Sequence, residues 1–198
     1  MTSYKEVQQG TQEWLLARLG CGTASRANDM CAAETTAAFQ NYLWDLVAER
    51  ETAQPAETYV NADMERGTAL EPIARAAYEA HTGTFVTQTG FWLHPEIKFF
   101  GASPDGLAGE GLIEIKCPRT STHLRYRSEG KVPTKYKRQM MCQLACTGRK
   151  WVDFVSFDDR VRESKRLFIV RYTPTEKEMA DMLEKVTAFL AEVEEESK

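Results

Sequence analysis

Residues 101–118 read Gly101-Ala-Ser-Pro-Asp105-Gly-Leu-Ala-Gly-Glu-Gly-Leu-Ile-Glu114-Ile-Lys116-Cys-Pro118. This stretch predicts the end of one strand, a glycine-rich hairpin turn and a second short strand. Side chains alternate across a strand, so the two isoleucines point to one face of the sheet while Glu114 and Lys116 point to the other. We therefore expect Asp105, Glu114 and Lys116 to meet at one place.

Two carboxylates and an amine in this arrangement suit the hydrolysis of a phosphodiester. Asp105 and Glu114 supply hard oxygen ligands of the kind that Mg²⁺ prefers, and Mg²⁺ commonly binds one or two carboxylates together with substrate phosphates. Lys116 can hold and help deprotonate an attacking water while it offsets charge on the phosphate. The spacing D-x8-E-x-K, preceded here by Pro104, resembles the motif of the PD-(D/E)XK nucleases. The same spacing also arises by chance, and the alternative is a surface hairpin with an ordinary Glu–Lys pair.

Length and composition predict one soluble domain over residues 1–198. The chain has 198 residues, 42% of them hydrophobic, which is enough to bury one sizeable core. No charged-then-apolar leader opens the sequence and no apolar run approaches the length of a membrane span, so we expect a cytoplasmic protein with no membrane partner. Five cysteines at irregular positions indicate reduced thiols.

The basic residues gather in one part of the chain, although the formal net charge is −4. From Lys116 to Lys150 there are ten lysines and arginines but one acid, Glu129. From Thr175 onward there are eight acids and three lysines. A basic segment beside a metal site indicates that a polyanion such as DNA lies across that site. A solvated helix face is the plainer explanation for any run of charges.

The start of the chain predicts a second candidate site. A short helix capped by Thr11 is closed by Gly20 and Gly22. Another helix is expected to begin at Thr23-Ala-Ser25 and to run to about Ala33, and its first N–H groups would form an anion site near Arg18. Considered alone, Ser25 is more simply explained as a helix cap and Arg18 as a surface charge.

Hydrophobic spacing predicts the remaining elements. Helices are expected over residues 36–50, 61–81, 121–128, 134–146 and 175–195, with a loop at 54–58. Strands are expected at 85–94, 98–102, 111–116, 151–157 and 167–172, the first three as a meander. This order predicts an α+β fold in which helices flank a central sheet.

Two of these helices carry candidate site residues. In helix 61–81, Glu71 is either a further metal ligand or an exposed charge. The apolar side of this helix is expected to comprise Met64, Ala69, Leu70, Ile73, Ala74, Ala77 and Tyr78. In helix 134–146, Tyr136, Gln139 and Gln143 share one flank.

Six short motifs occur in order along nearly the whole chain. They are Trp14-x3-Arg18-Leu19-Gly20, Thr23-Ala24-Ser25, Gly67-x3-Glu71, Ser103-Pro104-Asp105-Gly106, Glu114-Ile115-Lys116-Cys117-Pro118 and Tyr136-x2-Gln139. Together they resemble the lambda exonuclease (YqaJ-like) family of phage alkaline exonucleases, within the PD-(D/E)XK superfamily. The resemblance implies a restriction-endonuclease-like core with a central mixed sheet. It also implies a nuclease rather than an inert hairpin.

By this resemblance, two Mg²⁺ ions, or Mn²⁺ in their place, are expected at Glu71, Asp105, Glu114 and the backbone carbonyl of Ile115. Lys116 would serve the nucleophilic water, and Gln139 would position water or phosphate. The family's pocket for the 5′-phosphate of a DNA end corresponds to Arg18, Ser25 and Ser103, and Tyr136 is expected to contact DNA. The family's basic loop after the Ser25 segment has no counterpart here, because residues 32–36 contain no basic side chain.

The resemblance further implies a metal-dependent 5′-to-3′ exonuclease on linear double-stranded DNA that releases mononucleotides and leaves 3′ overhangs for single-strand annealing. It implies a ring-shaped homo-oligomer, most often a trimer, and a phage-type single-strand annealing protein as partner, in a bacterial or phage-infected host. Two alternatives stay open. They are another PD-(D/E)XK DNA endonuclease and a catalytically inactive DNA-binding module that kept the fold.

Overall fold

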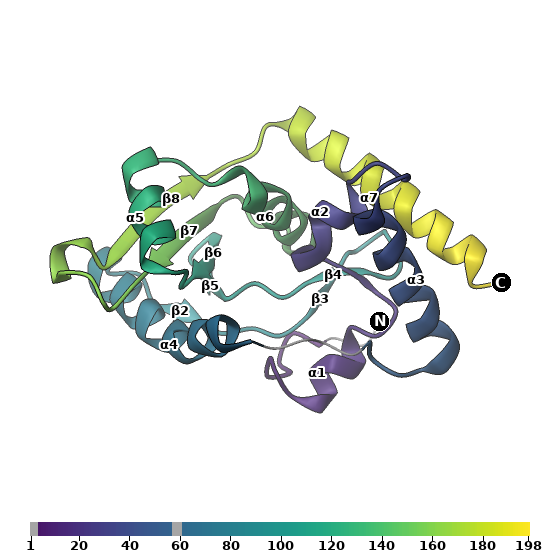
Figure 1. Ribbon diagram of the computed structural model, residues 1–198, viewed down its shortest axis with the longest axis horizontal. Helices are drawn as coiled ribbons and strands as arrows, with labels where there is room; N and C mark the ends of the chain where they lie inside the picture. Colours follow the sequence, from purple (N-terminus) through teal and green to yellow (C-terminus); the bar gives the residue numbers. More distant parts are fainter. Residues whose placement is uncertain (1–3, 57–60) are drawn as a thin grey trace.

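A mixed five-stranded sheet lies at the centre of the protein in the computed structural model, which describes residues 4–56 and 61–198 (Figure 1). The strands, in spatial order, are β2 (Val86–Thr87), β5 (Gly106–Ala108), β6 (Gly111–Lys116), β7 (Val152–Phe157) and β8 (Leu167–Tyr172). Strands β6 and β7 are parallel, and every other neighbouring pair in this sheet is antiparallel. The predicted α+β fold with a central mixed sheet flanked by helices is confirmed.

The parallel pair β6–β7 requires a crossover connection, and two helices supply it. They are α5 (Thr120–Glu129) and α6 (Thr134–Thr147), each ended by a glycine with positive φ, Gly130 and Gly148. All six residues of β7 are buried, as expected for a strand with helices on both faces. The predicted helices 36–50, 121–128, 134–146 and 175–195 and the predicted strands 151–157 and 167–172 agree with the structure to within two residues at each end.

Helix α4 (Ala62–Thr82) covers one face of the sheet. Asn61 caps its start and Gly83, with φ +69°, ends it. Ala74 and Tyr78 of α4 pack against Ile113 and Ile115 of β6, which confirms that the two isoleucines share a face. The predicted apolar side is confirmed at Leu70, Ala74 and Tyr78, which form the buried stripe of α4. The prediction for Met64 and Ile73 was wrong, because they lie beside this stripe and remain 49% and 53% exposed.

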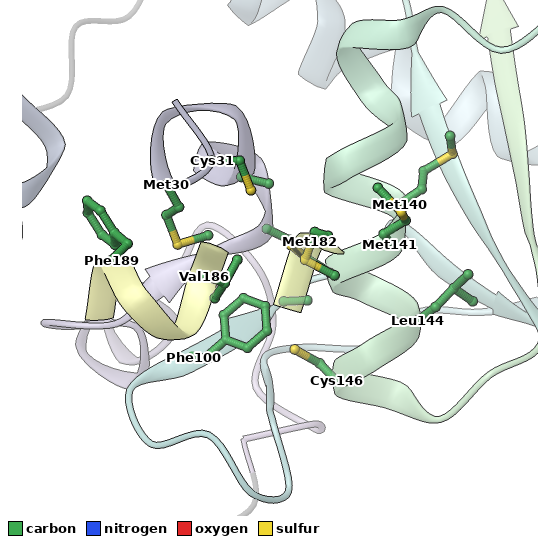
Figure 2. Close-up of a cluster of buried hydrophobic side chains, with 14 of the residues drawn as sticks. Met30, Cys31, Phe100, Met140, Met141, Leu144, Cys146, Met182, Val186 and Phe189 are labelled. Atoms are coloured by element: carbon green, nitrogen blue, oxygen red, sulfur yellow. Dashed lines mark hydrogen bonds between the residues drawn. The ribbon is translucent and has the colours of Figure 1, made fainter. Parts of the chain in front are cut away.

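The opposite face belongs to a larger core that is rich in sulfur. Helices α2 (Ala27–Met30), α3 (Ala37–Thr52), α6 and α7 (Glu176–Glu196) enclose it. Figure 2 shows Met140, Met141 and Leu144 of α6 on one side, Met182 and Val186 of α7 beside Phe100, and Met30 of α2 next to Phe189. Flexible thioethers fill the irregular space where four helices meet. All five cysteines are free thiols.

A second, three-stranded sheet replaces the predicted meander. Its order is β1 (Gly22–Thr23), β4 (Phe100–Ala102) and β3 (Trp92–Leu93), with β1 parallel to β4. The predicted strand 85–94 is therefore two short strands in different sheets. They separate at Gly90, whose N–H donates to the Lys5 carbonyl and where a Cβ atom would lie 2.3 Å from backbone oxygens of residues 4 and 7.

The N-terminal helix is confirmed as α1 (Gln12–Ala17), with Thr11 as its cap. The helix predicted to open at Thr23-Ala-Ser25 and to run to about Ala33 is present only in part. The Gly22 N–H donates to the Phe99 carbonyl and the Thr23 N–H to the Tyr42 hydroxyl, so this backbone is held in β1, and only a 3₁₀ turn (Ala24–Arg26) and the short α2 follow. The predicted loop 54–58 extends into residues 57 and 58, which lie outside the described residues. Among the described residues, no helix is long and apolar enough to cross a membrane.

Gly101 in β4 should be far more sensitive to substitution than Gly67 in α4. A Cβ at Gly101 would lie 2.2 Å from the Phe91 ring and 2.8 Å from the Trp92 carbonyl oxygen, whereas a Cβ at Gly67 would meet no atom within 4 Å. We expect Gly101→Ala to lower the free energy of unfolding by about 1–3 kcal/mol, and Gly67→Ala to raise it by about 0.5–1 kcal/mol. Urea unfolding of both variants measures this. Equal effects of the two substitutions would contradict the packing described here.

Candidate active site

A cleft of about 480 Å³ opens where strand β6 ends, between helix α4 and the start of helix α6. Five of the predicted metal-binding, catalytic or DNA-binding residues line it: Glu71, Asp105, Ile115, Lys116 and Tyr136. The remaining lining residues come from the first turns of α4 and from the segment after β6, namely Asn61, Asp63, Met64, Gly67, Thr68, Cys117 and Pro118. The structure therefore brings Glu71, Asp105 and Lys116 to one place, whereas Glu114 and Gln139 lie outside the lining of the cleft.

Asp105 lies in the loop between β4 and β5 rather than in the hairpin turn. Its Oδ2 accepts the Ile115 N–H at 2.6 Å. Strand β5 begins only at Gly106, and the Asp105 carboxylate takes the place of a strand partner beside β6. The N–H and C=O of a strand residue point to the same neighbour, so the Ile115 carbonyl faces the same side as Asp105. Gln9 Nε2 holds this loop by donating to the Pro104 carbonyl at 2.8 Å.

Glu114 is completely buried and surrounded by donors. Lys116 Nζ lies 2.5 Å from its Oε1, and Gln139 Nε2 donates to the same oxygen at 2.7 Å. Gln143 Nε2 donates to Oε2 at 2.5 Å. A buried carboxylate is tolerated only when paired and hydrogen-bonded, and here one cation and two amides meet that need.

Glu71 projects from α4 into the cleft and is not simply an exposed helix charge. Its side chain is 34% exposed, and Arg75, one turn along the helix, lies 2.5 Å from Oε1. Arg75 itself is mostly buried. The pair leaves Glu71 on the cleft wall with one side open.

The carboxylates influence one another strongly. Burial, followed by the charges of Glu114 and Glu71, raises the pKa of Asp105 well above its ordinary value, and Lys116 only partly opposes this. Burial also raises the pKa of Glu71, against the effect of Arg75. For Lys116, burial lowers the pKa, but the charges of Glu114 and Asp105 outweigh it and the net shift is upward. The site therefore contains more negative charge than its own lysine neutralises.

This donor set fits a divalent cation with a preference for oxygen. Within residues 4–56 and 61–198, no three His, Cys, Asp or Glu side chains are grouped so that they could hold a metal ion by themselves. Glu114 faces Lys116 and the two glutamines instead, and Glu71 faces Arg75. Mg²⁺ needs only one or two carboxylates and keeps several waters, so an open site with excess negative charge suits it.

Ion pairs hold the two walls of the cleft together. Asp158 is completely buried and accepts from Arg66 Nη2 of α4 at 3.0 Å and from Arg160 Nε at 2.8 Å. Arg160 Nη2 also donates to the Pro118 carbonyl at 3.3 Å. Burial works to raise the pKa of Asp158, but hydrogen bonds from Arg160 more than compensate and leave it well below its ordinary value. Helix α4 is thus tied to the segment that follows Lys116.

The predicted phosphate-binding residues lie outside the lining of this cleft. Arg18 stacks on the Trp14 ring with its guanidinium carbon 3.9 Å from the ring centre, and Trp14 Nε1 donates to Ser103 Oγ at 2.9 Å. Ser103 is two residues before Asp105, so this chain of contacts leads to the cleft. Arg18 Nε is buried and has no hydrogen-bond partner among the described residues.

Ser25 sits in the neighbouring 3₁₀ turn and is exposed. Its hydroxyl lies 3.3 Å from Thr23 Oγ1, and the Thr23 N–H donates to the Tyr42 hydroxyl at 2.9 Å. Tyr42 of α3 therefore shapes this turn. Ser25 presents an exposed side chain beside this turn, but not at the start of a long helix.

Tyr136 and Cys117 complete the cleft wall. Lys116 Nζ lies 5.2 Å and Lys135 Nζ 4.7 Å from the centre of the Tyr136 ring, so this aromatic face is lined by cations. Burial raises the pKa of the Cys117 thiol to about 12, which keeps it protonated and excludes it as a nucleophile at neutral pH.

The sequence missed two residues that shape the sites, Gln9 and Tyr42, and it placed Gln143 on the flank of Tyr136 and Gln139 without giving it a role. The flank shared by Gln143 with Tyr136 and Gln139 was a usable signal, because residues four apart on a helix reach the same neighbour. Gln9 and Tyr42 act over long sequence separations and had no such signal. The basic segment is also less free than its count suggested, since Arg119 pairs with Asp63, Lys150 with Glu110, and Arg149 donates to the Gly109 carbonyl.

Solved structures share this architecture. The alkaline exonuclease LHK-Exo from Laribacter hongkongensis, also solved in complex with dAMP, is 48% identical, with a TM-score of 0.89 over 94% of each chain. A phage related exonuclease from Haemophilus somnus 129PT has 14% identity and a TM-score of 0.68 over 88% of this chain and 94% of its own. The fold and the cleft thus define a nuclease of the PD-(D/E)XK type.

A family model described as the YqaJ-like viral recombinase domain matches residues 13–150. The chain belongs to this family and is a nuclease of it. A comparison with curated proteins found no match.

The raised pKa of Asp105 predicts a pH-dependent stability of the metal-free protein. At pH values above the ordinary aspartate pKa, the folded protein holds a proton that the unfolded chain has lost, so stability should fall as the pH rises and level off above the folded pKa. Asp105→Asn removes this titration. Its melting temperature should therefore gain on the wild type as the pH rises from about 4 to about 9.

The exposed Glu110→Gln, in the same hairpin, is the control for the change in charge. A constant difference between Asp105→Asn and wild type across the pH range would contradict the prediction.

Proposed function

We propose that this nuclease is a Mg²⁺-dependent 5′-to-3′ exonuclease that degrades one strand of linear double-stranded DNA, releases mononucleotides and leaves 3′ overhangs. The observation that carries the proposal is the meeting of Asp105, Glu71 and Lys116 in one cleft, with Glu114 joined to Lys116 directly beneath it. The similarity to an alkaline exonuclease supports the proposal that this protein is itself an exonuclease. The relative's complex with dAMP, a mononucleotide, supports mononucleotides as the product.

Glu71, Asp105, Glu114 and the Ile115 carbonyl would hold two Mg²⁺ ions, and Mn²⁺ would substitute. When bound, the metal would lower the pKa of the attacking water and neutralise charge on the phosphate. Lys116 would hold this water and offset phosphate charge with its ammonium group. Gln139 would orient water or phosphate from the helix side, and Tyr136 would pack against the DNA beside the cationic face formed by Lys116 and Lys135.

The 5′-phosphate of the strand end is assigned to Arg18, Ser25 and Ser103. A buried guanidinium nitrogen without a partner is the kind of group that a phosphate satisfies. The Trp14–Ser103 hydrogen bond relates this group to the Asp105 loop. This hydrogen bond would then fix the distance between the group that binds the 5′-phosphate and the carboxylate at the site of cleavage.

The proposal extends to assembly and partners. A ring of identical subunits, expected to be a trimer, would retain duplex DNA by topology, and a phage-type single-strand annealing protein would receive the 3′ strand in the cytoplasm of the host. The family resemblance supports both. The acidic end of α7, which includes Glu192, Glu194, Glu195 and Glu196, is the candidate docking surface.

Digestion of linear duplex DNA tests the function. Duplexes with 5′-phosphate or 5′-hydroxyl ends, each with one strand labelled, are incubated with Mg²⁺, Mn²⁺, Ca²⁺ or excess chelator. We expect loss of the strand from its 5′ end and free mononucleotides with Mg²⁺ or Mn²⁺, and no cleavage with Ca²⁺ or chelator. Internal cuts in circular DNA would favour an endonuclease, and DNA binding without any cleavage would favour an inactive module.

Lys116→Met should abolish cleavage without abolishing metal binding. Loss of the group that serves the water should lower kcat by about 10²–10⁴-fold. Asp105→Ala and Glu114→Ala should lose cleavage and metal binding together, because they remove ligands. Calorimetric titration with Mn²⁺ and turnover measurements separate the two classes. Wild-type turnover in Lys116→Met would refute the role given to this lysine.

Arg18→Ala should reduce the preference for phosphorylated ends, because it removes the guanidinium that would pair with the phosphate. The expected result is a ratio of rates on phosphate and hydroxyl ends that approaches one. Arg26→Ala is the matched control: its guanidinium also lies over an aromatic ring, that of Tyr42, but already pairs with Asp29 and Asp45. Loss of end preference in Arg26→Ala alone would reassign the pocket.

A further inference from the structure

Gln143 lies beneath the candidate active site and belongs to none of the six sequence motifs. It is completely buried in α6, and its Nε2 donates to Glu114 Oε2 at 2.5 Å. We propose that Gln143 is a positioning residue that fixes the plane of the Glu114 carboxylate and thereby sets the metal affinity of the site. This inference rests on the proposed function, in which Glu114 is a metal ligand.

The two glutamines of α6 divide the carboxylate between them. Gln139 and Gln143 are one helical turn apart, so both amides reach β6 from the same flank of the helix. Gln139 donates to Oε1, the oxygen that also faces Lys116. Among the described residues, the hydrogen bond to Oε2 comes from Gln143.

The strand backbone cannot fix this carboxylate without help. Pairing with β5 and β7 on either side holds the Glu114 backbone, but the last torsion of a glutamate side chain has a broad, roughly two-fold energy profile. Lys116 and Gln139 both contact Oε1, so they do not prevent rotation of the carboxylate about its last torsion. A donor to Oε2 prevents this rotation, and Gln143 is that donor.

The orientation of the Gln143 amide follows from the carboxylate. Ionised Glu114 can only accept, so Nε2 of Gln143 must face it and Oε1 must face away. Oε1 is buried and has no hydrogen-bond partner among the described residues. An amide that serves only packing of α6 would not be placed with one end unpartnered, because an apolar side chain of the same size packs there without that penalty. The amide is therefore placed for Glu114.

Gln143→Met tests the inference, since it keeps the volume of the side chain but removes the donor and the unpartnered oxygen together. Partners that orient a metal ligand typically change metal affinity or activity by about 10–100-fold when removed. We expect the Mn²⁺ dissociation constant to rise by about 10–100-fold, and kcat to fall by a similar factor at fixed Mg²⁺. The KM for DNA should stay within about two-fold. The melting temperature should stay within about 4 °C, a shift equivalent to about 1 kcal/mol in a domain of this size.

Two further variants make the outcome decisive. Gln143→Leu also removes the donor and keeps a similar side-chain volume, so it should raise the Mn²⁺ dissociation constant by the same factor. Met141→Leu is a volume-conserving substitution at a buried position of the same helix, and it should leave metal affinity and turnover unchanged.

Wild-type metal affinity in either folded Gln143 variant would overturn the inference. Unfolding of both would overturn it too, by making Gln143 a structural residue. Calorimetric metal titration without DNA gives this answer independently of cleavage. A wild-type protein that binds metal but cuts no DNA would therefore refute the proposed exonuclease and leave the result on Gln143 standing.

Discussion

The carboxylate of Glu114 is a charge enclosed in the protein interior, and its need for partners organises the site. Burying an unpaired carboxylate is prohibitively costly, so donors must surround it. Lys116 supplies the charge from the same strand, and α6 supplies two amides from the opposite wall. These contacts fix where α6 lies relative to β6. That position in turn places Tyr136, at the start of the same helix, on the wall of the cleft.

The cations at the site do not fully neutralise its carboxylates. The charges of Glu114 and Glu71 help to raise the pKa of Asp105, and Glu114 helps to raise that of Glu71, whereas Lys116 and Arg75 are the cations that face these carboxylates. Lys116 lies 2.5 Å from Glu114 and Arg75 lies 2.5 Å from Glu71, so these two cations already pair with the carboxylates in part. A divalent ion that joins the site would compete with them for the same oxygens, so its affinity depends on how firmly each carboxylate is already held.

Much of this arrangement could be predicted from the sequence because it rests on local patterns. The alternation of isoleucines with Glu114 and Lys116 in β6, and the apolar spacing of α6 and α7, predicted these elements and the faces that they bury.

The errors lie where segments distant in the sequence decide the structure. The strand expected at 85–94 divides because the N-terminal segment packs against Gly90. The helix expected to open at Thr23 begins only at Ala24, as a 3₁₀ turn, because Phe99 and Tyr42 hold the N–H groups of Gly22 and Thr23 in β1. No residue near Gln9 or Tyr42 signals those contacts.

The crossover between β6 and β7 also determines when the site comes into being. Glu114, Lys116, Gln139 and Gln143 all lie within the segment from Gly111 to Phe157, and that segment is complete only when β7 has paired with β6 in parallel. A parallel pair cannot form as a local hairpin, because its connection must first be laid across the sheet. During synthesis, therefore, the lysine and its carboxylate emerge well before the helix that steadies them. A chain interrupted before residue 152 would carry the Glu-x-Lys motif with no β7 to close the sheet behind it.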